Sequence, residues 1–172
     1  MKNSTASLPK TLNIGSILVI VGGLVPLLAS TVLYFAYLSS EQNPGKPWLS
    51  GQFPPGPAEY SLNDIQNFSR PVAVAFVTAQ HIELVNVMNS GLCVVLLALY
   101  GLRRFQKWAW YAILFTALWP GLNDAWALLA AHEPPVPLIG EIVSLAGLFL
   151  ARPAIFGGGQ QLQPAATARI AL

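Results

Sequence analysis

The sequence predicts an all-α membrane protein: an up-down bundle of four transmembrane helices with both termini on the inner side of the membrane. Apolar residues make up 54% of the 172 residues and charged residues only 9%, whereas about a quarter of an ordinary soluble domain is charged. The apolar residues also gather in long runs of about 20 residues, the length that crosses a bilayer as a helix. Most Lys and Arg residues fall in the segments that such a bundle places on one side.

Four segments are apolar enough and long enough to form one span each. The expected spans are residues 14–38, 79–102, 108–131 and 136–156. The turns "RRFQK" and "HEPPVP" between the later spans are short, so the helices that each turn joins must be antiparallel neighbours. Residues 1–156 are therefore expected to form one domain, and the Gly- and Gln-containing residues 157–172 a disordered cytoplasmic tail.

The long connection between the first two spans, residues 39–70, is rich in Pro and polar residues. We expect it to be an outer loop. Its "SLND" stretch, from Ser61 to Asp64, resembles a capping box, in which a Ser side chain and an acid three residues later bond to each other's backbone. This pattern predicts a short surface helix along 62–69.

The distribution of basic residues predicts the orientation. Seven of the nine Lys and Arg residues fall on one side of the bundle: Lys2, Lys10, Arg103, Arg104, Lys107, Arg152 and Arg169. Only Lys46 and Arg70 fall on the other side, which predicts both termini inside. The lipid bilayer is the expected surrounding, and a net charge of +2 offers no basic face for nucleic acid. The sequence leaves open whether the chain acts alone, as a homo-oligomer or within a larger membrane complex.

Three acidic residues, Glu83, Asp124 and Glu141, lie inside the predicted spans. At about 1.5 Å per residue, Glu141 lies about 16 Å from the inner boundary, near the midplane, and Asp124 lies about 25 Å from it. Asn86 has nearly the same depth as Asp124, so we expect these two residues to be neighbours. Because an acid that faces lipid costs several kcal/mol, we place the acids in the bundle interior.

These acids and the amides and hydroxyl nearest them in depth form a candidate intramembrane polar site. Its predicted members are Glu83, Asn86, Asn89, Ser90, Asn123, Asp124 and Glu141. At 100° per residue, Glu83, Asn86 and Ser90 share one helix face, and Cys93 lies on the same face.

Two spans also carry stripes of small residues, which allow helices to approach closely in a membrane. The stripes are Gly140, Ser144, Gly147 and Ala151 in the fourth span, and Gly15, Gly22, Pro26 and Ala29 in the first.

Asp124 has two interpretations. Pro120, four residues earlier, removes a backbone donor and leaves the Thr116 carbonyl short of a partner, so a kink there opens the helix. Asn123 and Asp124 then bond to Asn86, to the freed carbonyl or to water. Such a cluster either fixes how the helices pack or forms a proton or ligand site in an outward cavity.

Glu141 is the deepest acid, and no Lys or Arg shares its depth. A lone carboxylate there loses its hydration without compensation, so we expect Glu141 to be neutral at rest. We expect it to hydrogen-bond to Ser90, Asn89 or a backbone carbonyl. A structural role and a functional role are both open for this residue.

The outer side carries His81 and His132, near Glu83 and Glu133. His81 lies about 160° from Glu83 around the helix, so one ion cannot easily reach both, and we predict interfacial histidines and no metal. No cofactor motif is present, and Cys93, the single cysteine, is expected to be a small packing residue.

The stretch "LRRFQKWAWYAILFTALWP", residues 102–120, combines a basic turn with an aromatic-rich helix. It resembles a pattern in uncharacterised families of small bacterial integral membrane proteins, over about residues 71–156. The resemblance implies a four-helix transmembrane domain in the bacterial plasma membrane. It transfers no catalytic residue, and "HIELVNVMNS" is more polar than the corresponding helix of those proteins.

Three functions fit the sequence. The first is a non-enzymatic accessory or binding module with a buried polar cluster, which the sequence favours. The second is a proton-coupled small transporter or channel that uses Glu141 and Asp124. The third is a membrane enzyme that acts on a lipid with acid and base carboxylates. A dry, fully hydrogen-bonded cluster favours the first, a water path to both faces the second, and a cavity lined by all three acids the third.

Overall fold

The computed structural model describes residues 8–49, 57–131 and 136–157. Four long helices dominate this part of the chain, which confirms the helical fold class. They are α1 (Lys10–Gln42), α3 (Arg70–Tyr100), α4 (Lys107–Ala131) and α5 (Val136–Phe156). The smaller elements are β1 (Pro47–Leu49), β2 (Pro57–Ser61), α2 (Leu62–Phe68) and the 3-10 turn η1 (Leu102–Arg104).

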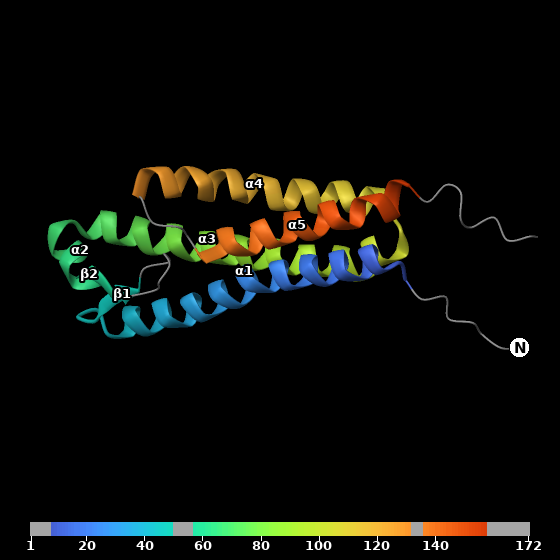
Figure 1. The fold of residues 1–172 in the computed structure, drawn as a ribbon. Helices are drawn as coiled ribbons and strands as arrows, with labels where there is room; N and C mark the ends of the chain where they lie inside the picture. Colours follow the sequence, from blue (N-terminus) through green and yellow to red (C-terminus); the bar gives the residue numbers. More distant parts are fainter. Residues whose placement is uncertain (1–7, 50–56, 132–135, 158–172) are drawn as a thin grey trace, which may run out of the picture.

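The long helices lie side by side in an elongated bundle (Figure 1). Helix α1 packs against α3 and α5, and α4 packs against the same two helices. We call the end with η1, the start of α1 and the end of α5 the basic end, because Lys10, Arg103, Arg104, Lys107 and Arg152 lie there. We call the opposite end, with α2, β1 and β2, the hairpin end.

Three helices of the described chain are long enough and apolar enough to cross a membrane: Lys10–Gln42, Arg70–Arg104 and Pro137–Phe156. The 25-residue helix α4 is not among them. Its Pro120, Asn123 and Asp124 and its several Trp residues interrupt the apolar run that such a helix requires. Four spans therefore remain a proposal, whereas three membrane-compatible helices are observed.

Three helix boundaries differ from the prediction, and the first is the start of α1, at Lys10 rather than residue 14. Helix α1 continues to Gln42, so residues 39–42 are helical rather than loop, and α3 begins at Arg70 rather than near residue 79. The apolar runs mark only the part of each helix that suits lipid, whereas a helix continues until a capping or breaking residue stops it. Pro71 at the first turn of α3 is typical of a helix start.

The connection between α1 and α3 contains a small hairpin and the predicted short helix. Strands β1 and β2 pair antiparallel, a feature that the sequence did not predict. Helix α2 begins with a complete capping box: the Ser61 backbone N–H and hydroxyl each donate to Asp64 Oδ2 at 2.7 Å, and the Ser61 oxygen accepts from the Asp64 N–H. The capping prediction is confirmed, and these bonds hold the pKa of Asp64 below its ordinary value.

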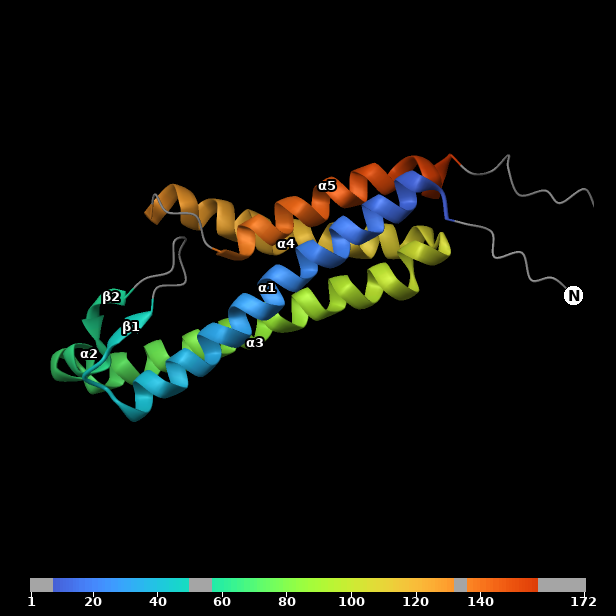
Figure 2. The same ribbon diagram turned by 60° about the horizontal axis from the view of Figure 1, so that its bottom comes forward.

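Helices α1 and α5 meet through the small residues of the two stripes. A Cβ added at Gly15 would lie 2.6 Å from the Gly147 carbonyl oxygen, and one added at Gly140 would lie 2.5 Å from the Gly22 carbonyl oxygen. Neither position has room for a side chain, so the backbones touch. Figure 2 shows α1 lying against α5 near the basic end and against α3 toward the hairpin end.

The half of the bundle at the basic end is filled by one buried apolar cluster, which we call the basic-end core. Its members are Leu12, Val19, Val94, Ala98, Leu102, Trp110, Ile113, Leu148, Ala151 and Ile155. Trp110 donates from Nε1 to the Leu148 carbonyl at 2.9 Å, and its ring meets those of Phe149 and Phe156 edge to face. Trp110 is thus a buried anchor, although its position near the span boundary suggests an interfacial residue.

Candidate functional site

A cavity of about 660 Å³ lies between the four long helices, in the half of the bundle toward the hairpin end. Gly22, Gly23 and Pro26 of α1 contribute its apolar backing. The polar lining residues come from the other three helices: Glu83, Asn86 and Ser90 of α3; Thr116, Asn123 and Asp124 of α4; and Glu141 and Ser144 of α5. The polar lining residues of the described chain thus come from the three helices that contain the second, third and fourth predicted spans.

Six of the seven predicted site residues line this cavity, and the predicted neighbours Asn86 and Asp124 are both on its wall. The exception is Asn89, which is exposed and does not line it. Depth alone suggested Asn89, but one residue along a helix turns the side chain by 100°, away from Ser90. Asn89 therefore belongs to the outer surface of α3.

The cavity has an exposed rim and a buried floor. Glu83, Asn86, Trp119 and Asn123 are exposed and line it, and all four belong to α3 or α4. The buried lining residues include Gly91, Val94, Ala117, Glu141 and Ser144. The mouth therefore lies between α3 and α4, and the floor lies against α1 and α5.

Glu141 lies at the floor with only 7% of its surface exposed. Its Oε2 atom is buried and has no hydrogen-bond partner in the described structure, so the predicted bond to Ser90, Asn89 or a carbonyl is not made by this oxygen. Gly121 of α4 makes room for the carboxyl group, because a Cβ at that position would lie 3.0 Å from Oε2. The acid thus spans from α5 to the backbone of α4.

Asp124 lines the same cavity as the other two acids. It is close enough to Glu83 and to Glu141 for electrostatic repulsion with each of them. Its Oδ2 atom is buried and also has no hydrogen-bond partner among the described groups. No Lys, Arg or His is found among the described residues that line the cavity. The site therefore concentrates carboxyl groups without a balancing cation.

Pro120 and Thr116 line the cavity next to these acids. Helix α4 continues through Pro120. Because proline has no N–H, the Thr116 carbonyl lacks its usual helical donor. The Thr116 hydroxyl points back along the helix and donates to the Ala112 carbonyl at 2.8 Å. The proline thus adds backbone acceptor capacity to the cavity wall, without ending the helix.

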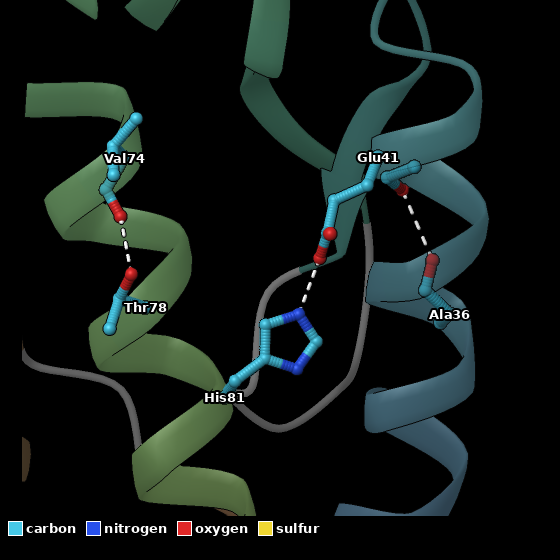
Figure 3. Close-up of polar contacts among 6 residues, drawn as sticks. Ala36, Glu41, Val74, Thr78 and His81 are labelled. Carbon is cyan, nitrogen blue, oxygen red and sulfur yellow. Dashed lines mark hydrogen bonds and ion pairs between the residues drawn. The ribbon is translucent and has the colours of Figure 1, made fainter. Parts of the chain in front are cut away.

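His81 has a partner that the sequence did not predict. Its Nε2 lies 2.5 Å from Oε1 of Glu41 at the end of α1. The centroid of its ring lies 4.9 Å from that of the Tyr34 ring, in an edge-to-face arrangement. Figure 3 shows the His81 ring reaching from α3 toward Glu41. The sequence assigned Glu41 to a loop, and only the extension of α1 to Gln42 brings it level with His81. His132 and Glu133 lie outside the described residues.

Cys93 also departs from its predicted role, since it is exposed on the outer surface of α3 and is not a packing residue. Val94, its neighbour in sequence, takes the buried position. Within the described ranges, no three His, Cys, Asp or Glu side chains are grouped so that they could hold a metal ion.

No protein-family model, no curated protein and no solved structure matches this chain. The resemblance of residues 71–156 to small bacterial membrane proteins therefore stays a prediction, and the chemistry of the cavity rests on its geometry.

Proposed function

We propose that the chain is an integral membrane protein with four spans and both termini inside, and that its cavity binds a small ligand from the membrane. On this proposal it is a binding module, the first of the three functions considered. Three membrane-compatible helices and basic residues gathered at one end support the membrane placement. Because the cavity mouth lies between α3 and α4, a ligand dissolved in the bilayer would reach it from the side.

One observation carries the binding proposal: a cavity of about 660 Å³ holds two buried carboxyl oxygens without partners, on Asp124 and Glu141. A polar cluster that served only to fix helix packing would have its buried groups hydrogen-bonded, as most buried polar groups are. The volume falls within the range of small-molecule sites. A ligand with hydrogen-bond donors would satisfy these two oxygens.

The geometry supports a channel less well. The cavity lining ends near Val94, Thr116 and Ser144. Beyond these residues the basic-end core closes the bundle, with Leu102, Ile113 and Leu148 fully buried. A path to both faces would require this core to open.

An enzyme that acts on a lipid is the second candidate, because Glu83, Asp124 and Glu141 meet at one cavity. Neighbouring carboxyl groups in different environments can divide the roles of acid and base. The two candidates differ in one measurement: an enzyme converts its ligand and a binding module returns it unchanged.

The membrane placement can be tested by cysteine labelling in a Cys93→Ala background, because Cys93 is itself exposed. Asn63→Cys and Gln106→Cys place one exposed thiol at each end of the bundle. We expect a membrane-impermeant maleimide to label residue 63 on intact cells and residue 106 only after permeabilisation. The reverse pattern would overturn the orientation, and labelling of both sites on intact cells would overturn the four-span topology.

The binding function can be tested with three amphiphiles that share one tail: dodecylamine, dodecanol and dodecanoate. The protein is placed in phosphatidylcholine nanodiscs, and its melting temperature is followed as each compound is added, since a ligand of the native state stabilises it. Asn86→Phe fills the rim of the cavity, and Asn89→Phe is a matched control on the outer surface of the same helix. At least one compound should stabilise the wild type and Asn89→Phe but not Asn86→Phe. Equal responses from all three proteins would reject the binding function.

A further inference from the structure

We infer that the ligand of this cavity carries a protonated amine, held between Glu141 and Asp124, on an apolar body that extends through the mouth between α3 and α4. This inference rests on the proposed binding function and specifies the chemical class of the ligand. It follows from charge, from unused hydrogen-bonding capacity and from the character of the walls.

The charge of the cavity is unbalanced. Glu83, Asp124 and Glu141 line it, and no basic residue of the described chain does. His81, two residues before Glu83, is turned toward α1 and is occupied by Glu41. Lys46 and Arg70 lie at the hairpin end, in the loop and at the first residue of α3. A cationic ligand would supply the charge that the bundle lacks, whereas an anionic one would be repelled.

The unused hydrogen-bonding capacity also points to a donor. Glu141 is more than nine-tenths buried, and its Oε2 has no partner. Asp124 Oδ2, on the facing helix, is likewise buried and without a partner. A protonated amine offers up to three N–H donors, so one group can bond to both carboxyl groups, whereas a hydroxyl offers only one. Hydrogen bonds between charged partners are also the stronger kind.

The walls suit an apolar body attached to this head group. Ile82, Val87 and Val94 of α3 and Trp119 of α4 line the cavity. The Trp119 ring is exposed at the rim and stacks on the Phe115 ring, with 6.2 Å between the two ring centroids. An aromatic ring at the entrance favours a cation on its way in as well as an alkyl chain that remains there. A hydrated inorganic cation would gain nothing from these walls.

The amphiphile titration in nanodiscs tests the inference, because dodecylamine, dodecanol and dodecanoate differ only in the head group. Phosphatidylcholine has no net charge, so it does not concentrate the amine by itself. We expect dodecylamine to bind the wild type and Asn89→Phe at least about tenfold more tightly than dodecanol, with no binding of dodecanoate. Glu141→Gln, which keeps the shape of the side chain, should weaken the binding of dodecylamine about 30-fold and change that of dodecanol by less than about threefold.

Asp124→Asn provides a second test if the Glu141 variant does not fold, and the comparison of head groups on the wild type requires no variant. Dodecanol or dodecanoate binding as tightly as the amine, and lost in Asn86→Phe, would overturn the amine class but leave the binding function standing. Absence of any binding that Asn86→Phe removes would overturn both. Amine binding that survives both Glu141→Gln and Asp124→Asn would also overturn the inference.

Discussion

The two halves of the bundle use the same four helices for opposite purposes. In the basic-end half, Leu102, Ile113 and Leu148 are completely buried, and Trp110 donates its hydrogen bond to the Leu148 carbonyl; Ser16 Oγ is a buried polar atom without a partner in the described structure. In the hairpin-end half, the helices enclose a cavity of about 660 Å³, and Asp124 and Glu141 have buried oxygens without partners. One half is built for stability, and the other keeps space and polar groups that cost stability.

Residue size and polarity explain the difference. Large apolar side chains from all four helices interdigitate in the basic-end core. Around the cavity, the small residues Ser90, Ala117 and Gly121 occupy inward positions of α3 and α4, whereas Gly91 of α3 meets the α1 backbone at Gly23. Small residues that do not meet a partner backbone leave volume, whereas those of α1 and α5 bring two backbones into contact. Small residues thus bring α1 and α5 into backbone contact, whereas on the cavity walls of α3 and α4 they leave space.

The largest expected effect is the loss of a core side chain in the packed half. Leu148→Ala should lower the free energy of unfolding by about 3 kcal/mol, because it removes a fully buried side chain and leaves a void. Val87→Ala, on the cavity wall, should cost less than about 1 kcal/mol, because that side chain already borders empty space. Denaturant unfolding in detergent micelles measures both. Equal costs would remove the distinction between the two halves.

The backbone contact between α1 and α5 should be nearly as sensitive to substitution as the basic-end core. Gly140→Ala should cost about 1–3 kcal/mol, because the added methyl group meets the rigid backbone of α1. Gly121→Ala is the matched control in the cavity half, where the nearest atom belongs to the end of the Glu141 side chain and can move. We expect that variant to change stability by less than about 0.5 kcal/mol. If Gly140→Ala is as mild as the control, α1 and α5 are not held by backbone contact.

A smaller effect, of opposite sign, is expected at the cavity floor. Glu141→Gln should stabilise the ligand-free protein by about 1 kcal/mol, because it replaces a buried ionisable group that has no partner on Oε2. The melting temperature in nanodiscs without added amphiphile measures this change. A clear loss of stability would mean that the carboxyl group already has a partner, and the cavity half would then resemble the packed half.

The smallest effect concerns α2, outside both halves. The pKa of Asp64 is below its ordinary value of 3.8 because the Ser61 hydroxyl and backbone N–H donate to it. A lowered folded-state pKa means that its contribution to stability is present above the unfolded value and is lost as pH falls through the folded value. Amide exchange of α2 should therefore accelerate below about pH 4 relative to its intrinsic rate. Asp64→Asn should exchange faster at pH 6 and lose this dependence, and an unchanged rate in that variant would show that the cap does not hold the helix.

The sequence predicted those features that depend on local pattern. The capping box of α2, the small-residue stripes of α1 and α5 and six of the seven polar residues of the cavity follow from residue type and helical period. It failed where the answer depends on how helices rotate and end. Asn89 and Cys93 face outward because α3 is rotated so that Val94 points inward. Glu41 meets His81 because α1 continues beyond its apolar segment. The void itself could not be predicted, since it depends on how the remaining volume is filled.

If the protein spans a membrane as proposed, the unequal lengths of its helices have a consequence for how it would sit in lipid. Helix α1 has 33 residues and α5 has 21, which correspond to about 50 Å and about 32 Å, against a hydrocarbon core of about 30 Å. A long helix normally absorbs such a mismatch by tilting. Here α1 cannot tilt far on its own, because its glycines hold it against α5, which already matches the bilayer. In the proposed orientation, the excess length would emerge at the hairpin end, where Glu41 and His81 join α1 to α3. That end would then project beyond the outer leaflet, and the thickness of the surrounding membrane would determine how much of it is exposed to water.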